Sequence, residues 1–265
     1  MPIIPINGKK VHVQELNKGA AETVVMVHGM FSNLSVYYFN IAPLLALRFH
    51  VVLYDLKSHG MSERTRDGYD LDSMSDDLRA LMDALGLEKV HLVGYSFGAL
   101  ISLKAALRFP GRIDRLIMIE GPDPADDKTR GIMDEYSREF LEHYIRNFTD
   151  ATKVQMGKRQ LERNHRMYEY LFYQTTIKQD MLAEKDFFSS DAIAGLEHHP
   201  LLIYGSRSNC LRAGYFLKER IPGAELEEIE GDHNVPVQAP EAVAGVLLHF
   251  LTEAVPVMEP DGNVF

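Results

Sequence analysis

The stretch KVHLVGYSFGALISLKAALRF, residues 89–109, decides the fold. Its first part, 89–96, is an apolar run typical of a strand buried on both faces, and 99–109 has the apolar spacing of a helix. Between them stands GYSFG, residues 94–98, a Gly-x-Ser-x-Gly motif. A tight strand-to-helix turn holds such a serine in a strained backbone conformation with its hydroxyl exposed, and the glycines leave room for the turn. We therefore predict that Ser96 is a nucleophile.

Strand and helix signals alternate on both sides of this motif. A hairpin turn at Asn7-Gly8 precedes a loosely alternating strand at 11–16. Apolar runs predict further strands at 23–29, 50–55, 115–121, 201–205 and 224–231, and helical patterns lie at 36–47, 71–86, 211–220 and 239–251. This alternation predicts an α/β fold, a doubly wound and mostly parallel sheet of about eight strands with helices on both faces.

The region 123–199 interrupts the alternation, because it contains no strand signal. Aromatic residues at helical spacing mark two segments of it: Tyr136, Phe140, Tyr144 and Phe148, then Tyr168, Tyr170, Phe172 and Tyr173. We interpret 123–199 as a helical insertion into a core formed by 1–122 and 200–265, with its rings packed onto that core and some of them lining a pocket. Residues 255–265 have the composition of a loose tail.

Composition limits the classes of partner. Apolar residues make up 46% and charged residues 25% of the chain, as in an ordinary globular enzyme. The net charge of −10 argues against a nucleic-acid partner, which requires a concentrated basic face. No run approaches the ~18–20 apolar residues that span a bilayer, no signal peptide is visible, and the lone Cys210 allows no internal disulfide. The expectation is a soluble cytoplasmic protein with no metal site.

Two other loops supply what a serine nucleophile needs. A serine hydroxyl requires an adjacent base, and GDHNV at 231–235 places His233 between the last predicted strand and the last helix. HGMF at 28–31 follows a predicted strand and suits an oxyanion hole, with one donor from this loop and one from the residue after the nucleophile. We assign the backbone N–H groups of Met30 and Phe97 to that hole.

Taken together, four motifs resemble the α/β-hydrolase fold family in order and spacing: HG (28–29), DLKSHGMS (55–62), GYSFG (94–98) and GDH (231–233). The resemblance covers nearly the whole chain. It implies an eight-stranded sheet with a helical cap inserted after strand six, and a mainly structural role for the DLKSHGMS loop. The family covers many chemistries, so the fold does not by itself settle the function.

In this family a carboxylate usually completes a triad with the serine and the histidine by orienting the histidine ring. That acid is missing here from its usual position. In most of the family it follows the seventh strand, which here ends at Gly205 and leads to Ser208 and Asn209. Some members place the acid after the sixth strand instead, where this chain has Glu120. Adjacent strands lie ~4.8 Å apart, so Glu120 can reach the histidine. Asp123 is the alternative acid, and a third option is Asn209, a water or an inactive dyad.

The predicted function is cofactor-free acyl hydrolysis of a partly apolar small molecule. Ser96 attacks a carboxylic ester or thioester, or a lactone, with His233 as general base, as in a carboxylesterase or thioesterase. A serine nucleophile argues against dehalogenase and epoxide hydrolase chemistry, whose members use aspartate there. The alternatives are hydrolysis of a carbon–carbon bond next to a ketone, a cofactor-free reaction in which His233 is the base, and a non-hydrolytic receptor. The oligomeric state stays open.

Overall fold

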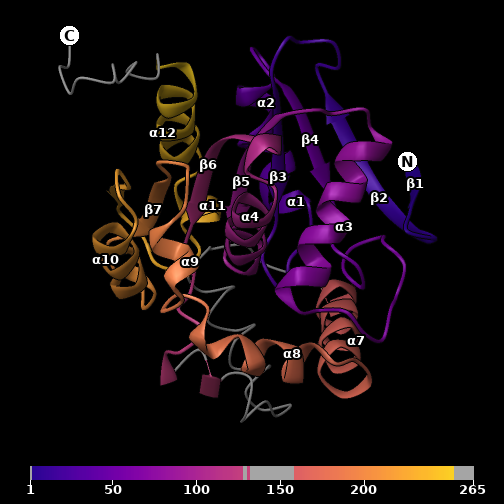
Figure 1. Cartoon of the computed structure of the whole chain (residues 1–265). Helices are drawn as coiled ribbons and strands as arrows, with labels where there is room; N and C mark the ends of the chain where they lie inside the picture. The colour runs from indigo at the N-terminus through magenta and orange to yellow at the C-terminus, as the bar shows by residue number, and fades with distance from the viewer. Residues whose placement is uncertain (1, 128–129, 132–157, 254–265) are drawn as a thin grey trace, which may run out of the picture.

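An eight-stranded sheet forms the centre of the computed structural model, which describes residues 2–127, 130–131 and 158–253 (Figure 1). The strand order is β1-β2-β4-β3-β5-β6-β7-β8, and only β1 and β2 run antiparallel to their neighbours. The strands are β1 (Ile3–Ile6), β2 (Lys9–Leu16), β3 (Thr23–Val27), β4 (His50–Tyr54), β5 (Val90–Tyr95), β6 (Ile113–Ile119), β7 (Leu201–Gly205) and β8 (Glu225–Ile229). The predicted mostly parallel sheet is thereby confirmed.

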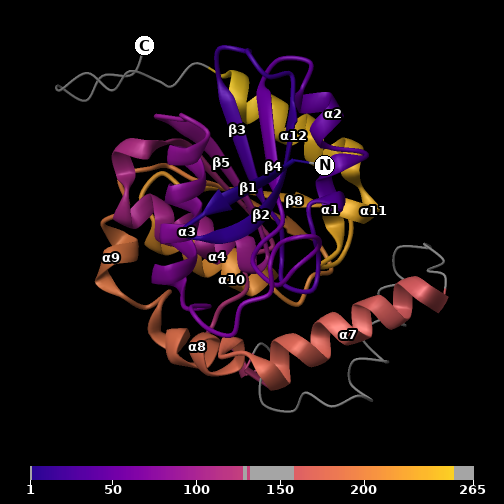
Figure 2. The same cartoon turned by 90° about the vertical axis from the view of Figure 1, so that its right-hand side faces the viewer.

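The central strands are buried on both faces because helices cover both sides of the sheet. Every residue of β4, β5 and β7 is buried, which explains their continuous apolar runs. Figure 2 shows the two helical layers. One contains α3 (Leu71–Ala84), α4 (Phe97–Arg108) and α10 (Leu211–Arg220), and the other contains α1 (Ser35–Tyr38), α2 (Ala42–Leu45) and α12 (Pro240–Thr252). Two further short helices are η1 (Pro110–Arg112) and α11 (Val235–Gln238).

The single helix predicted over 36–47 is two short helices in the structure. α1 ends at Tyr38, and α2 begins at Ala42 with Pro43 in its first turn. A continuous helix would place Pro43 in its interior, where the ring clashes with the carbonyl four residues earlier and a backbone donor is lost. The chain therefore breaks the helix and restarts it where proline is tolerated.

After β6, the described part of the predicted insertion is helical. It comprises α7 (Lys158–Gln174), α8 (Ile177–Ala183), η2 (Glu184–Asp186) and α9 (Asp191–Ala194), and no strand occurs between 158 and 199. In α7, Tyr168, Tyr170 and Phe172 are buried, whereas Tyr173 is 65% exposed. The aromatic residues Tyr136, Phe140, Tyr144 and Phe148 and the tail at 255–265 lie outside the described residues.

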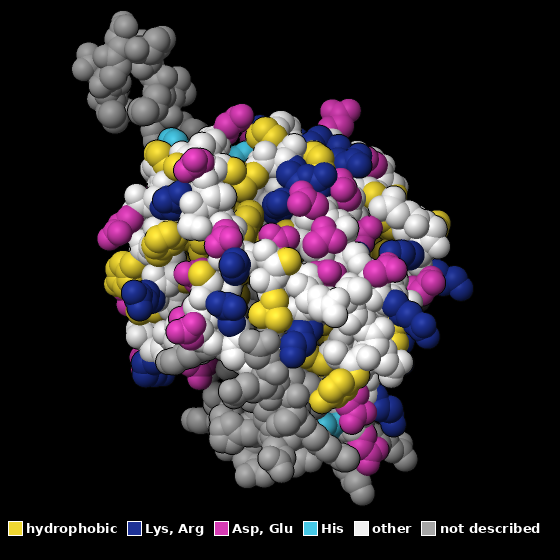
Figure 3. Space-filling view, turned by 60° about the horizontal axis from the view of Figure 1, so that its bottom comes forward, with side chains coloured by type: hydrophobic (Ala, Val, Ile, Leu, Met, Phe, Trp, Pro, Cys, Tyr) yellow, Lys and Arg dark blue, Asp and Glu magenta, His cyan; other side chains and the backbone are white. Residues whose placement is uncertain are grey.

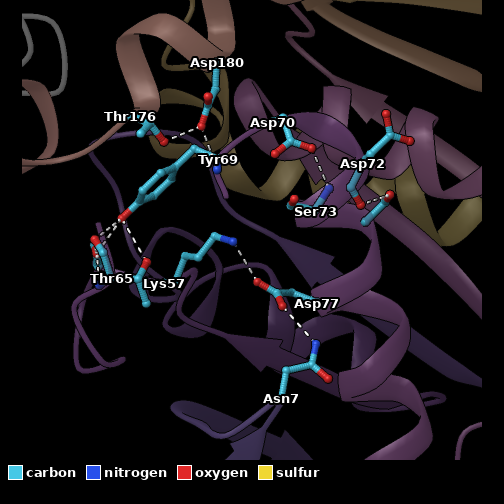
Figure 4. Close-up of polar contacts among 12 residues, drawn as sticks. Asn7, Lys57, Thr65, Tyr69, Asp70, Asp72, Ser73, Asp77, Thr176 and Asp180 are labelled. Carbon is cyan, nitrogen blue, oxygen red and sulfur yellow. Dashed lines mark hydrogen bonds and ion pairs between the residues drawn. The ribbon is translucent and has the colours of Figure 1, made fainter. Parts of the chain in front are cut away.

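Polar contacts attach α8 to the start of α3 (Figure 4). One carboxylate oxygen of Asp180 accepts the Tyr69 N–H at 2.9 Å and the Thr176 hydroxyl. Glu184 accepts the Leu71 N–H at 3.0 Å, one of the N-terminal donors that a helix cannot satisfy internally. Because these acceptors lie on the segment after α7, they fix that segment against the core.

One face of the described part of the molecule carries side chains of both charges. Figure 3 shows acidic and basic side chains interspersed over one face, with hydrophobic side chains scattered between them. In the ranges that the structure describes, no helix is long and apolar enough to cross a membrane.

Candidate active site

Ser96 occupies a strained turn between β5 and α4. Its φ and ψ angles are 53° and −118°, values that a non-glycine residue rarely adopts. The Ser96 N–H donates to the Ile119 carbonyl at 2.8 Å, which ties the turn to the neighbouring strand β6. Because the helix starts at once with Phe97, the serine hydroxyl is left at the carboxyl edge of the sheet.

The two glycines of the motif are required by close backbone approach. A Cβ on Gly94 would lie 2.3 Å from the Gly98 carbonyl oxygen, and a Cβ on Gly98 would lie 2.2 Å from the Val27 carbonyl oxygen. Both separations are far below van der Waals contact. The motif therefore packs the first turn of α4 directly against the end of β3.

His233 lies within hydrogen-bond distance of the serine. Its Nε2 is 3.0 Å from Ser96 Oγ, although 137 residues separate the two in sequence. The Tyr95 hydroxyl donates to the His233 carbonyl at 2.9 Å, and the two rings are 5.5 Å apart. Asp232 accepts the Asn234 N–H at 2.8 Å and so shapes the turn that carries the imidazole. The loop after β8 thus holds the histidine over the strand-to-helix turn.

Glu120 completes a linear arrangement. Its Oε2 lies 3.0 Å from His233 Nδ1, and its side chain is fully buried at the end of β6. Glu120 has a φ of 55°, so the chain accepts an unfavourable backbone conformation here. The Gly205 N–H donates to the other oxygen, Oε1. These contacts satisfy a carboxylate that would be costly to bury alone.

Ser208 stands at the position where most of the family has its acid, and its hydroxyl contacts Glu120. Ser208 donates a hydrogen bond to Glu120 Oε2, the oxygen that faces the histidine, and accepts the Cys210 N–H at 3.0 Å. The sequence alone identifies residue 208 as a position without a carboxylate and does not indicate a contact with Glu120. The signal available was the small hydroxyl itself, but its partner lies 88 residues away.

The other acid candidates point elsewhere. Asp123 accepts the Ala125 N–H at 2.8 Å in its own turn, and Asn209 Oδ1 contacts the Cys210 thiol at 3.7 Å. Of the three positions considered, Glu120 alone has a hydrogen bond to His233 among the contacts of the described residues.

The environment of His233 favours its protonated form. Burial opposes that form, but hydrogen bonding with Cys210 and with the Glu120 carboxylate outweighs the effect and raises the pKa of His233 above its ordinary value of 6.5. An imidazole held in this way accepts a proton readily and is stabilised while it carries the charge.

The predicted oxyanion loop lies against the serine. A Cβ on Gly29 would lie 3.0 Å from Ser96 Cβ, so the HGMF loop passes directly beside the turn. Met30 follows in that loop, and Phe97 is the first residue of α4. This placement is compatible with the assignment of their N–H groups, which stays a prediction.

Two buried histidines shape the same loop. The imidazole of His28 accepts the Leu56 N–H at 2.9 Å, and that of His59 accepts the Phe31 N–H at 3.3 Å. Burial, together with the neighbouring His28, lowers the pKa of His59 to about 3, and burial also lowers the pKa of His28. Both rings therefore stay neutral and act as acceptors that fix the loop.

Aromatic side chains of α7 pack beside this loop. The ring of Phe31 meets Tyr168 edge-on at 4.6 Å and stacks on Phe172 at 5.3 Å. The Tyr168 hydroxyl donates to the Phe31 carbonyl at 3.2 Å. Helix α7 therefore packs aromatic surface against Phe31, the residue that follows Met30 in the predicted oxyanion loop.

Three side chains near the serine bring a carboxylate oxygen, a thiol sulfur and an imidazole nitrogen close together. Single ligand atoms of Glu120, Cys210 and His233 all lie within 4.8 Å of one another. Cys210 follows Ser208 in the loop after β7 and is half-buried. The sequence contained no motif with metal-ligand spacing that would have indicated this group.

Known proteins resemble the chain over most of its length. It is 29% identical over 244 residues, 87% of this chain and 91% of the relative, to the "Putative carbamate hydrolase RutD" of Caulobacter sp.. The enol-lactonase of Burkholderia xenovorans superposes with a TM-score of 0.74 at 20% identity, covering 95% of this chain and 100% of the other. The meta-cleavage product hydrolase CumD of Pseudomonas fluorescens gives 0.76 at 22% identity, covering 96% and 98%.

The family comparison agrees with the fold and with the motifs. The structural likenesses lie below 25% identity and show the fold alone. The family model described as "alpha/beta hydrolase fold" matches residues 22–240, which include the loops that carry Ser96, Glu120 and His233. The chain therefore belongs to the alpha/beta hydrolase fold family.

Proposed function

We propose that this chain is a serine hydrolase that cleaves a carboxylic ester or thioester, or a lactone. Its family supports the coarser statement, an enzyme that is a hydrolase. The observation that carries the finer one is the continuous series from Ser96 Oγ through the imidazole of His233 to Glu120 Oε2, with 3.0 Å at each junction. Both distances are suitable for proton transfer and for orientation of the ring.

In the proposed mechanism each group has its own step. With the proton of neutral His233 on Nδ1 and directed at Glu120, Nε2 is free to accept the Ser96 proton as Oγ attacks the carbonyl carbon. His233 then protonates the leaving alcohol or thiol, which departs and leaves an acyl-enzyme. Water, activated by the same nitrogen, hydrolyses that intermediate and restores the serine.

Glu120 stabilises the imidazolium in both halves of the reaction. Its carboxylate is fully buried and fixed by Gly205 and Ser208, so it needs little reorganisation when the charge develops. The N–H groups of Met30 and Phe97 are proposed to bind the tetrahedral oxyanion.

The substrate proposed is partly apolar on its acyl side. Phe31, Tyr168 and Phe172 form an aromatic cluster directly beside the proposed oxyanion loop. Relatives and neighbours are named for carbamate, enol-lactone and meta-cleavage product hydrolysis, so the same fold is used for several acyl-type bonds. The test also has outcomes for the three alternatives, which are hydrolysis of a carbon–carbon bond next to a ketone, a cofactor-free reaction in which His233 is the base, and a receptor role.

The test combines active-site labelling with a substrate panel. Wild type should react rapidly with a fluorophosphonate probe at Ser96 and should hydrolyse p-nitrophenyl esters and acyl-thioesters of some chain length. Ser96→Ala should be inert to the probe and lose turnover. A protein that resists the probe and turns over no ester, thioester or lactone would contradict the proposal, and ligand binding without turnover would favour the receptor role.

A further inference from the structure

A thiol stands beside the acid and the base, and the proposed mechanism gives it no role. Ligand atoms of Cys210, Glu120 and His233 lie within 4.8 Å of one another. The Cys210 N–H donates to Ser208 Oγ at 3.0 Å, and that same hydroxyl donates to Glu120. The loop after β7 therefore holds the cysteine next to the acid.

We propose that Cys210, His233 and Glu120 form a site for a borderline-soft divalent cation such as Zn²⁺, and that the bound ion inhibits the enzyme reversibly. Sulfur, imidazole nitrogen and carboxylate oxygen are the three protein donors that zinc takes. Hard ions such as Mg²⁺ prefer oxygen donors and fit this set poorly.

One ligand pair is already close to the spacing of a tetrahedral site, and the sulfur lies nearby. With Zn–S of ~2.3 Å and Zn–N or Zn–O of ~2.0–2.1 Å, tetrahedral ligands lie roughly 3.3–3.6 Å apart. His233 Nδ1 and Glu120 Oε2 are already 3.0 Å apart, and the sulfur lies within 4.8 Å of the ligand atoms of both. Cys210 is half-buried, so rotation about its χ1 bond can provide the remaining shift. Three protein ligands leave the fourth position to water, as in an exchangeable site.

Binding at Nδ1 removes the general base. The thiol of Cys210 releases its proton to solvent, and the sulfur binds the ion as thiolate. The imidazole proton leaves Nδ1, where the ion binds, and moves to Nε2. That nitrogen, 3.0 Å from Ser96 Oγ, then carries a proton and has no lone pair for the serine. Removal of the ion by a chelator reverses both proton movements.

The inhibitory part rests on the proposed hydrolase function, whereas ion binding does not, so the two are measured separately. Zinc binding is measured by titration calorimetry on wild type, Cys210→Ser, Cys210→Ala, Ser96→Ala and His249→Ala. Loss of an outer-shell partner alone weakens metal sites by ~10–100-fold, so both Cys210 variants should bind zinc at least about tenfold more weakly. Ser96→Ala should bind as wild type does.

His249→Ala is the matched surface control. The His249 imidazole lies 2.9 Å from Glu253 in an exposed pair, another combination that could take up zinc. Its removal should leave the Cys210-dependent affinity unchanged. Co²⁺ provides a second readout, because thiolate ligation produces a charge-transfer absorption that Cys210→Ser should abolish. Wild type without zinc binding, or Cys210 variants with wild-type affinity, would overturn the site.

Turnover rates measured with and without zinc test whether the bound ion inhibits the enzyme. On the best substrate of the panel, zinc should lower the wild-type rate at concentrations that match its calorimetric affinity, EDTA should restore the rate, and Mg²⁺ should have no effect. Each Cys210 variant, compared with its own zinc-free rate, should need at least about tenfold more zinc for half inhibition. Zinc that binds through Cys210 without slowing turnover would overturn the inhibition, and a wild type inactive on every substrate would contradict the proposed function while the binding results stand.

Discussion

The hydroxyl of Ser208 and the carboxylate of Glu120 are hydrogen-bonded across the loops that follow β7 and β6. The hydroxyl reaches Oε2, the oxygen that lies 3.0 Å from His233 Nδ1. The position that most of the family uses for its acid is thus occupied by a hydrogen-bond donor to the proposed acid, Glu120.

Replacement of Glu120 by glutamine should lower kcat by roughly 10³–10⁴-fold, because a neutral amide neither fixes the productive tautomer nor stabilises the imidazolium. The change is isosteric, so the thermal transition should show a folded protein. Steady-state kinetics on the best ester of the panel measures the effect. A Glu120→Gln enzyme of near-normal rate would contradict the assignment, and Asp123→Asn should then be measured.

Ser208→Ala removes the hydroxyl and should lower kcat by about tenfold, or ~1.4 kcal/mol, because Glu120 Oε2 loses a charge-assisted hydrogen bond. Ser208 is a positioning residue, so Ser208→Thr should restore most of the rate and KM should change little. Asn209→Ala is the neighbouring control and should stay close to wild type. Equal losses in the two alanine variants would indicate general disturbance of the loop.

An acid introduced at residue 208 should partly replace Glu120. The Ser208 side chain already reaches the carboxylate oxygen that faces His233. We therefore expect Glu120→Gln with Ser208→Asp to recover at least about tenfold of the kcat lost in Glu120→Gln alone. Glu120→Gln with Asn209→Asp serves as the comparison, and equal recovery in both would show that residue 208 has no special geometry.

The pH dependence of kcat/KM should report the raised pKa of His233. In the proposed mechanism the neutral imidazole is the base, so activity should rise with pH as His233 loses its proton. Because the pKa of His233 lies above 6.5, the half-maximum of the acidic limb should also lie above pH 6.5. Glu120→Gln removes one of the groups that raise this pKa and should shift the limb to lower pH. A limb that did not shift would contradict the coupling.

The glycines at 98 and 245 should respond oppositely to alanine, although both lie in helices. A Cβ at Gly98 would meet the Val27 carbonyl oxygen at 2.2 Å, whereas a Cβ at Gly245 would have no described atom within 4 Å apart from its chain neighbours and its own helix backbone. Gly98→Ala should lower the free energy of unfolding by more than ~2 kcal/mol, and Gly245→Ala should raise it by ~0.5–1 kcal/mol. Urea unfolding measures both, and a neutral Gly98→Ala would contradict the close packing.

Much of the fold could be predicted because the sheet is buried on both faces. The runs at β4, β5 and β7 are apolar throughout, and the Gly-x-Ser-x-Gly motif locates the turn between β5 and α4. The break between α1 and α2 was missed because apolar spacing continues across it. Pro43 was the available signal, since it cannot lie inside a helix.

The residues of the candidate site also differ in whether the sequence alone can predict them. Ser96 and His233 follow from local motifs, whereas the partners of Glu120 depend on contacts between loops far apart in sequence. The hydrogen bond from Ser208 and the proximity of the Cys210 sulfur come from the conformation of the turn after Gly205. No periodicity or motif specifies that conformation, so only the three-dimensional structure shows it.

The position of Glu120 also bears on how this enzyme could diversify. A relative with its acid after β7 must keep one side chain of that loop fixed, but here the requirement falls on the end of β6, where Glu120 has a φ of 55°. The segment 206–210 needs only to keep a small hydroxyl near the acid. The other side chains of this segment should therefore tolerate substitution, which makes them an entry point for laboratory evolution of new substrate ranges.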